Sequence, residues 1–300
     1  MFTTIIVQPI FNLLVLIYAL IPGHNFGLAV ILFTILVRLL MWPLVKKQLH
    51  HAKAIRTLQP EIKRIKKEAA GDKRKEQMLT MELYKEREIN PLSSLGILVV
   101  QFIILIGLYS GLNKIIKDPN QIISFSYPIL HHLGWLQTLS HDIHRFDDSL
   151  FGFINLTRTA VNPLYWPAMV LVLGSAAAQF VQGRQLLPKS QDSRTLRQIL
   201  RESGQGKSAD QQEVNAAVGR STMYILPLFV FLVSVRFAAA LPLYWLTGSV
   251  VAILQQSRIL KEDVQEAEAS VKVTTRTLDD EPKQKVKKAS KNKKSRRKRR

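Results

Sequence analysis

The chain contains no cysteine, which excludes disulfide bonds, thiolate metal sites and a lipid-modified N-terminal cysteine. Its long apolar runs contain no aspartate or glutamate, the groups with which proton-coupled transporters usually bind their ion inside the membrane. The sequence also lacks a glycine-rich phosphate loop, a zinc-binding motif and a nucleophile elbow. These absences argue against an enzyme, and we expect no catalytic residue, no cofactor and no metal.

Apolar and charged residues are separated along the chain. The mean hydropathy is +0.06 although the formal net charge is +20. Residues 92–112 carry no charge, whereas residues 46–87 and 283–300 are dense in lysine and arginine. This segregation is typical of a membrane protein that carries basic segments in water.

The apolar runs are long enough to cross a bilayer. A spanning helix needs about 20 mostly apolar residues. We therefore predict an all-α polytopic membrane protein with five transmembrane helices, at about residues 27–44, 91–112, 163–183, 221–235 and 238–256. The fourth is short, so it is expected to tilt or to end at a shallow depth.

The first 22 residues are also apolar, but they lack the basic start and the cleavage site of a removable signal peptide. Gln8, Pro9 and Asn12, with the break Pro22-Gly23-His24-Asn25, leave little room for a separate span and a return. We predict that residues 1–22 form an external amphipathic helix in the membrane interface. A sixth span is the alternative.

The basic residues predict the orientation, because short loops rich in lysine and arginine stay in the cytoplasm. Residues 1–37 have no lysine or arginine, and residues 46–87 have many. The N-terminus is therefore expected outside, together with residues 113–162. The segment 184–220 and the C-terminus are expected in the cytoplasm, and the simplest location is a bacterial cytoplasmic membrane.

Residues 46–90 are predicted to form a cytoplasmic helical hairpin. Leu58, Ile62 and Ile65 recur at helical spacing before a break at Gly71-Asp72, and a second periodic segment follows. The hairpin is either a docking surface for a partner or a solvated spacer.

The external segment contains four histidines close to aspartates. His131, His132, His141 and His144 lie near Asp142, Asp147 and Asp148. Their spacing matches no familiar set of metal ligands. We therefore expect a polar external loop.

Residues 260–300 are predicted to form a basic, disordered cytoplasmic tail, because blocks of like charge repel one another. The tail lacks aromatic residues to stack on bases, so it is expected to bind ribosomal RNA through phosphates. Anionic lipid is the alternative partner. The residues expected to contact the ribosome are Lys293, Lys294, Arg296, Arg297, Lys298, Arg299 and Arg300.

One arginine lies within the first predicted span. Burying the Arg38 guanidinium costs several kcal/mol unless it faces water or a partner. Arg38 therefore either faces a hydrated internal hollow or snorkels to the inner interface. Polar residues of the spans could line such a hollow, although each can also serve as a hydrogen bond between helices. The hollow would be positive because the spans contain no acidic residue.

Several strings, in order and at characteristic spacing, resemble the YidC/Oxa/Alb family of membrane protein insertases. The resemblance runs from about residue 8 to residue 256. It is carried by Gln8-Pro9-Ile10-Phe11-Asn12, Asn25-Phe26-Gly27, Thr34-Ile35-Leu36-Val37-Arg38, Trp42-Pro43-Leu44, Leu58-Gln59-Pro60, Asn90-Pro91-Leu92, Gly107-Leu108-Tyr109, Phe180-Val181-Gln182, Leu226-Pro227, Leu243-Tyr244-Trp245 and Ile253-Leu254-Gln255-Gln256.

The resemblance implies a five-helix core over residues 23–259, with a hydrophilic groove open to the cytoplasm and to lipid but closed outside. The implied groove residues are Arg38, Thr34, Gln101, Gln182 and Gln256. Apolar faces near Phe102, Leu105, Leu228 and Val230 would form a hydrophobic slide that guides a substrate helix into lipid.

The implied partners are nascent membrane proteins, the ribosome, membrane lipids and, in some reactions, a Sec-type translocon, with the chain acting as a monomer. The alternative functions are a channel or transporter for an anionic solute and a membrane tether for ribosomes. The chain departs from the family pattern at Ile97, Ile103, Arg236, Ala238-Ala239-Ala240 and Ser249, positions that bear on groove shape and substrate preference.

Overall fold

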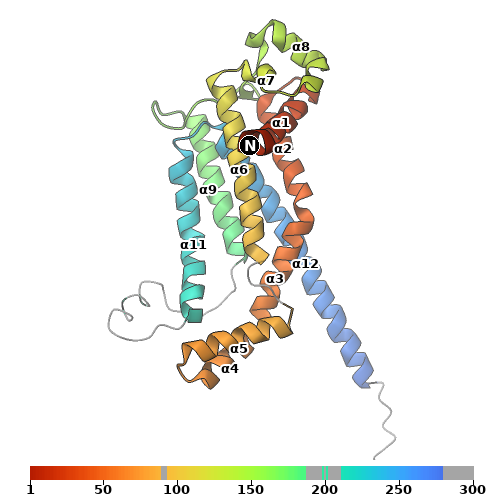
Figure 1. The fold of residues 1–300 in the computed structure, drawn as a ribbon, viewed down its shortest axis with the longest axis vertical. Coiled ribbons are helices and arrows are strands. Elements are labelled where there is room, and N and C mark those ends of the chain that lie inside the picture. The colour runs from red at the N-terminus through yellow and green to blue at the C-terminus, as the bar shows by residue number, and fades with distance from the viewer. Residues whose placement is uncertain (89–92, 187–197, 199–200, 202–210, 280–300) are drawn as a thin grey trace, which may run out of the picture. The chain divides into compact units, whose positions relative to one another are not determined.

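The computed structural model describes residues 1–88, 93–186, 198, 201 and 211–279. Helices dominate these residues (Figure 1), so the prediction of a mainly helical chain is confirmed. The chain divides into two units, Met1–Gln256 and Ser257–Arg300. Among the described residues, Thr3–Leu20 and Val99–Lys117 are long and apolar enough to cross a membrane, and a bent helix pair would be a third span. That the chain has five spans stays a prediction.

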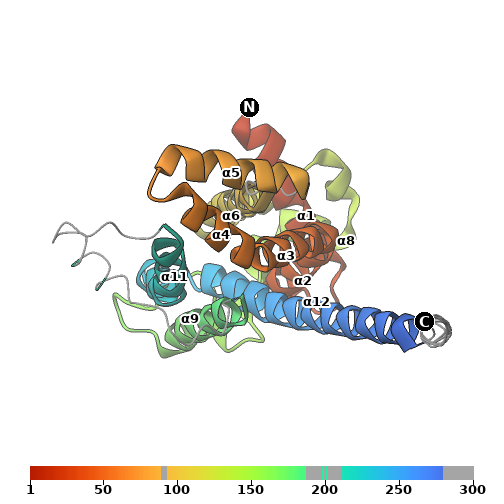
Figure 2. The ribbon, with the colours of Figure 1, turned by 90° about the horizontal axis from the view of Figure 1, so that it is seen from below.

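The N-terminal segment forms a short π-helix, η1 (Thr3–Val7), which continues into α1 (Gln8–Leu20). One face of α1, with Phe11, Leu14 and Tyr18, is buried in the core. Figure 2 looks along α6 (Ser93–Lys117) and shows α1 running across it. Thr3–Leu20 has the length and composition of a span. The interfacial helix therefore stays a prediction, with the sixth span as its alternative.

Two glycines of α6 make the crossing close. The Ile10 side chain fills the space where Gly107 would carry a β-carbon, and a β-carbon on Gly111 would lie 3.2 Å from Cδ2 of Phe11. Small residues four positions apart let two helices approach closely. The Gly107-Leu108-Tyr109 string of the family pattern thus forms part of the surface on which α1 packs.

The first predicted span is not one straight helix. Asn25 caps α2 (Phe26–Leu40), because its Oδ1 accepts a hydrogen bond from Leu28 N at 3.0 Å. The helix ends at Met41, and α3 (Trp42–Thr57) continues at an angle of 52°. Pro43 has no N–H to donate to the preceding turn, which accounts for the break. The predicted window 27–44 thus covers α2 and the start of α3, and its place as a span stays a prediction.

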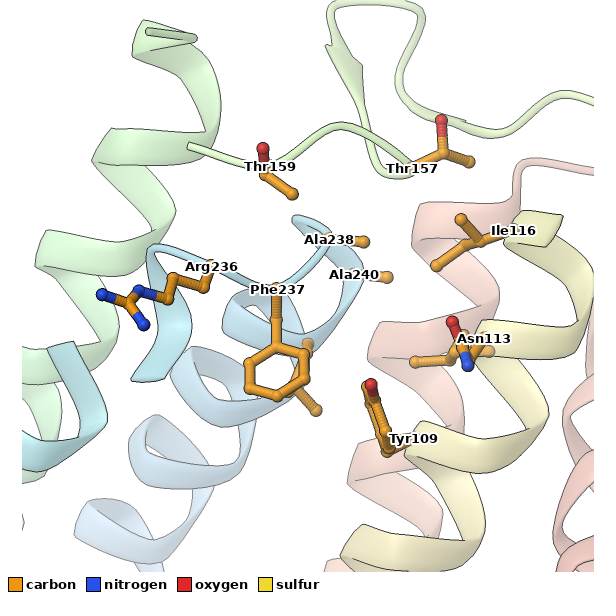
Figure 3. Close-up of a pocket in the computed structure, with 11 residues that line it drawn as sticks. Tyr109, Asn113, Ile116, Thr157, Thr159, Arg236, Phe237, Ala238 and Ala240 are labelled. Carbon is orange, nitrogen blue, oxygen red and sulfur yellow. The ribbon is translucent and has the colours of Figure 1, made fainter. Parts of the chain in front are cut away.

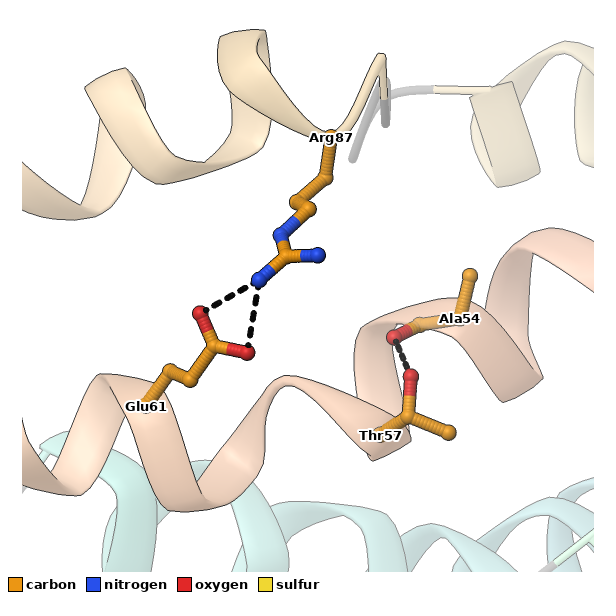
Figure 4. A network of polar contacts seen from close by, with 4 residues as sticks. All are labelled: Ala54, Thr57, Glu61 and Arg87. Carbon is orange, nitrogen blue, oxygen red and sulfur yellow. Dashed lines mark hydrogen bonds and ion pairs between the residues drawn. The ribbon is translucent and has the colours of Figure 1, made fainter. Parts of the chain in front are cut away.

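Residues 46–90 contain one more break than the sequence predicted. After α3, the chain turns at Leu58 and forms α4 (Gln59–Ala69), whose second residue is a proline. The turn to α5 (Lys73–Glu86) lies at Ala70-Gly71-Asp72, where Gly71 has φ +96°. The two helices bury Leu58, Ile62 and Leu83 between them. The Arg87 guanidinium donates to both carboxylate oxygens of Glu61, at 3.1 and 3.2 Å (Figure 4).

The other predicted spans fall on longer helices. They are α6, α9 (Trp166–Leu186), α11 (Gln211–Ser234) and α12 (Ala240–Asp279). The helices α9 and α11 pack against each other (Figure 2). The helix α12 runs on to Asp279, so the described residues 260–279 are helical where the sequence predicted a disordered tail. The basic residues 293–300 lie outside the described residues.

The segment 113–162, which the sequence predicts to be external, is folded rather than a plain loop. It contains α7 (Gln121–Ser124), η2 (Pro128–His132), α8 (Gly134–His141), η3 (Ile143–Arg145) and an antiparallel pair of short strands, β1 (Ser149–Leu150) and β2 (Ile154–Asn155). It is tied to α2 through Asn25 Nδ2, which donates to Asp147 Oδ2 at 2.8 Å. It is tied to α12 through Ala239 N, which donates to Arg158 O at 2.9 Å.

Candidate functional site around Arg38

Arg38 lies in the last turn of α2, against Gly248 of α12. A β-carbon on Gly248 would lie 3.2 Å from Nη2 and 3.5 Å from Nε of Arg38. The same position would be 3.7 Å from Cγ2 of Thr34, one turn before Arg38. A larger residue at 248 would push the guanidinium aside, so the glycine makes room for the arginine between the two helices.

Within the part of the chain that the structure describes, no carboxylate forms an ion pair with Arg38. Arg38 is half-buried, and the hydroxyl group of Tyr244 on α12 is close enough to interact with it electrostatically. A partly buried cation without a counter-ion is costly unless water or a bound anion reaches it. Among the described residues, the charge of Arg38 therefore has no acidic partner.

The helix break after Arg38 is stabilised from α12. Because α2 ends at Met41, the carbonyl oxygen of Arg38 can accept a hydrogen bond from another helix. Gln255 Nε2 donates to this oxygen at 2.9 Å. The bond uses the backbone of Arg38 and leaves its guanidinium available for other contacts.

Two further hydrogen bonds join helices near this site. Gln101 Nε2 of α6 donates to the hydroxyl oxygen of Tyr244 at 2.9 Å. Ser249 Oγ of α12 donates to Oε1 of Gln179 on α9 at 3.2 Å. Polar contacts from α2, α6 and α9 therefore converge on α12 between Tyr244 and Gln255.

The other predicted groove residues differ in their surroundings. Thr34 is buried, and its hydroxyl donates to Val30 O of its own helix at 2.7 Å. Gln182 and Gln256 each have a buried amide oxygen without a hydrogen-bond partner among the described residues. The described contacts do not join Gln182 or Gln256 to Arg38. Buried amide oxygens normally have a partner, so these two require water or another polar group.

The four predicted slide residues are not equivalent. Phe102 and Leu228 are exposed, Leu105 packs partly against the core, and Val230 is only 3% exposed. On α6, Val99, Phe102 and Ile106 form one exposed apolar face, and on α11 Ile225, Leu228 and Leu232 do the same. These exposed faces can contact lipid or a substrate helix.

Three residues of the site were absent from the predicted groove set. They are Gly248, Tyr244 and Gln255. Gly248 interrupts an apolar helical window, which is a signal of close packing. Tyr244 belongs to the Leu243-Tyr244-Trp245 string, and Gln255 precedes a second glutamine. Adjacent positions of a helix point in different directions, so only one of Gln255 and Gln256 can face Arg38. The sequence alone did not show which of the two it is.

A cavity of about 230 Å³ lies at another place, between α6, the start of α12 with the residues that link it to α11, and the segment that holds Thr157 and Thr159 (Figure 3). None of the predicted groove residues lines it. Arg236, Ala238 and Ala240, where the chain departs from the family pattern, contribute to its wall. Figure 3 shows the guanidinium of Arg236 directed away from Tyr109 and Asn113. No three histidine or acidic side chains of the described residues lie close enough together to hold a metal ion.

Comparison with known proteins gives consistent matches. The sequence model of the family described as 60Kd inner membrane protein matches residues 16–266. Membrane protein insertase YidC of Fusobacterium nucleatum subsp. nucleatum is 28% identical over 238 residues, 79% of this chain and 87% of the relative. Membrane protein insertase MisCA of Bacillus subtilis is 28% identical over 263 residues, 86% of this chain and 79% of the relative. ALBINO3-like protein 1, chloroplastic, of Arabidopsis thaliana is 28% identical over 237 residues, 78% of this chain and 42% of the relative.

Proposed function

We propose that this chain, which belongs to the YidC/Oxa/Alb family described by the 60Kd inner membrane protein model, is a membrane protein insertase. The observation that carries the mechanism is the position of Arg38, which lies against Gly248 with no carboxylate partner among the described residues. We assign the chain to a bacterial cytoplasmic membrane, with its N-terminus outside and its C-terminus in the cytoplasm.

In this proposal the substrate is a nascent membrane protein whose polar tail must leave the cytoplasm. Polar groups are costly in hydrocarbon because nothing there replaces their bonds to water. A hydrated groove around Arg38 lowers that cost, and the guanidinium attracts acidic groups of the tail. The amide oxygens of Gln182 and Gln256, which have no partner among the described residues, would accept hydrogen bonds from water or from the passing chain.

The apolar part of the substrate would leave along the exposed faces of α6 and α11. Phe102 and Leu228 lie on these faces, whereas Val230 is buried and would support the slide from behind. Burying the apolar substrate helix in lipid supplies the free energy of insertion. Insertion by this route therefore requires neither a nucleotide nor a covalent step.

The cytoplasmic parts would bring the substrate to the groove. We propose that the basic tail holds translating ribosomes and that the hairpin of α4 and α5 provides a second docking surface. The hairpin has its own small core, and several of its lysines and arginines are exposed, including Lys63, Arg64 and Lys67.

The test is insertion into proteoliposomes that contain only this protein. Two charges about 4 Å apart interact by about 1 kcal/mol in water and about 4 kcal/mol in surroundings of intermediate polarity. Arg38→Ala should therefore slow the insertion of an acidic-tailed substrate by about fivefold or more, at 1.4 kcal/mol per tenfold change. Arg38→Lys should retain part of the activity.

Leu39→Ala is the matched control, since Leu39 is the exposed neighbour of Arg38 on the same helix. Wild-type rates for Arg38→Ala with several acidic-tailed substrates would remove Arg38 from the mechanism. Anion flux without insertion would instead support a channel or transporter, and ribosome capture without insertion would support a tether.

A further inference from the structure

The turn between β1 and β2 presents two aromatic side chains that the fold leaves uncovered. Phe151 is exposed, and Phe153 is 84% exposed. Between them, Gly152 has φ +74° and Phe151 itself has φ +53°. A bulky residue is unfavourable in this left-handed conformation, where asparagine or glycine is usual. The conformation of the turn therefore does not explain why a phenylalanine is present at position 151.

Hydrogen bonds and packing of the flanking residues hold the backbone of the turn in place. Asp148 Oδ2 accepts hydrogen bonds from Asn155 Nδ2 at 3.1 Å and from Thr157 Oγ1 at 3.2 Å. Leu150 packs on Gly27 at the start of α2, where a β-carbon would lie 2.7 Å from its side chain. The exposed phenylalanines are thus fixed in place by the protein and are not the end of a loose loop.

The turn is also joined to the start of α9. The Tyr165 hydroxyl accepts a hydrogen bond from Asn155 N at 2.9 Å and donates to Phe153 O at 3.3 Å. Directly after Tyr165, Trp166 begins an exposed stripe that continues through Val170 and Leu173 at helical spacing. The aromatic turn therefore continues an apolar helix face of the kind that contacts lipid.

The charges around the turn fit a lipid surface. Asp147 and Asp148 directly precede β1, and their carboxylates accept hydrogen bonds from side chains of the protein. Beyond them, residues 149–166 contain one arginine, Arg158, and no acidic residue. Its guanidinium lies over the Tyr165 ring, 4.3 Å from the ring centre. A cation beside exposed aromatic rings matches the boundary between lipid phosphates and acyl chains, where aromatic side chains concentrate.

We propose that the β1–β2 turn is a lipid anchor, with Phe151 and Phe153 inserted into the bilayer surface beside α9 and Arg158 facing the phosphates. The inference rests on the membrane location that the proposed function requires. The same segment bonds the start of α12, through Leu156 O to Ala240 N at 3.0 Å and Arg158 O to Ala239 N at 2.9 Å. The anchor therefore sets the depth of α12 and of Gly248, eight residues further along that helix.

The test uses single cysteines in the full chain, which has none of its own. Phe153→Cys, labelled with an environment-sensitive dye and placed in vesicles of phosphatidylcholine and phosphatidylglycerol, should emit at shorter wavelength than in water. Lipids brominated near the headgroup should cause a larger loss of emission than lipids brominated near the chain ends. Gln137→Cys, exposed on α8, is the control expected to remain in water, and Val170→Cys is the control expected deep in lipid.

Water-like, unquenched emission at Phe153 overturns the anchor. If Val170 is quenched in the same vesicles, the span of α9 and the proposed function stand while the anchor fails. If Val170 is also unquenched, the span of α9 fails with it. A shift to shorter wavelength at Phe153 without bromine quenching would mean that protein covers the turn, which also overturns the lipid assignment.

Discussion

The guanidinium of Arg38 occupies the space next to Gly248 into which any larger residue at position 248 would place its side chain. This relationship joins the last turn of α2 to the middle of the apolar part of α12. It explains why a glycine, which weakens a helix interior by about 0.5–1 kcal/mol relative to alanine, is present there. The position of the charge therefore depends on two helices that are distant in sequence.

Enlarging Gly248 should displace the charge without removing it. Gly248→Leu is expected to lower insertion of acidic-tailed substrates toward the level of Arg38→Ala, because the leucine side chain competes with the guanidinium for the same space. Gly248→Ala should have a smaller effect, since its β-carbon requires only a small shift of a flexible side chain. Insertion rates at matched membrane levels measure both variants.

Gly96→Leu is the control, because a β-carbon at position 96 of α6 meets no atom within 4 Å. Its insertion rate should match the wild type. Unchanged insertion by Gly248→Leu would show that the contact with Gly248 does not hold Arg38 in its working position.

Removing the Gln255 side-chain amide should destabilise the helix break. Gln255→Leu leaves the carbonyl oxygen of Arg38 without its donor, and an unsatisfied buried polar group costs about 1–3 kcal/mol. The melting temperature in detergent should fall. Arg38→Ala keeps this bond, so the effects of Arg38→Ala and Gln255→Leu on stability are expected to add.

Leu254→Ala serves as the neighbouring control, because Leu254 is exposed and its truncation should change stability by about 0.5 kcal/mol or less. An unchanged melting temperature for Gln255→Leu would mean that water replaces the amide at the break.

The predicted orientation can be measured with the same cysteine-free background. Single cysteines at Lys67, Gln137 and Ser290 place one reporter in the hairpin, one in the external segment and one in the tail. A membrane-impermeant thiol reagent added to intact cells should label only the Gln137 position, since basic segments stay inside. After lysis all three should react. Labelling at Lys67 in intact cells would refute the five-span orientation.

The basic tail should bind ribosomes through phosphate contacts. If about six contacts form, the logarithm of the binding constant should fall with the logarithm of salt concentration at a slope of about −4 to −5. Removal of residues 283–300 should abolish most of this salt-dependent binding in co-sedimentation of the detergent-solubilised protein. Replacing all tail lysines and arginines by glutamine is the length-matched control and should act like the truncation.

Binding and a salt slope that are unchanged by the truncation would assign the ribosome contact to another segment. The exposed lysines and arginines of α4 and α5 would then be the next positions to test.

The helices were predictable wherever a long apolar run carried the signal. The window 91–112 corresponds to α6 and the window 163–183 to α9, because a charge-free run of that length in lipid can satisfy its own backbone as a helix. The short elements of residues 113–162 were not predicted. The strands β1 and β2 have two residues each, too few for an alternating pattern. They are held by the Asp148 carboxylate, which bonds the Asn155 side chain, and by the Tyr165 hydroxyl, which bonds Asn155 N.

The candidate site was predictable in part. Arg38 was identified because a guanidinium within an apolar run is costly wherever the chain folds. Gln101 was identified as polar, but its partner, the hydroxyl of Tyr244, could be found only after α6 and α12 were placed together. Val230 has an apolar side chain suited to the slide, yet the packing of α11 buries it.

Composition and order along the chain by themselves determined the helical class, the segregation of basic segments and the family motifs, because these depend on the transfer of each segment between water and hydrocarbon. Only the tertiary structure decided that α1 crosses α6 at Gly107 and Gly111, that the chain bends between α2 and α3, and that Gly248 and Gln255 adjoin Arg38. These contacts join residues far apart in sequence, and their geometry depends on how the helices pack. The charge of the site is thus a property of the sequence, and its position is a property of the fold.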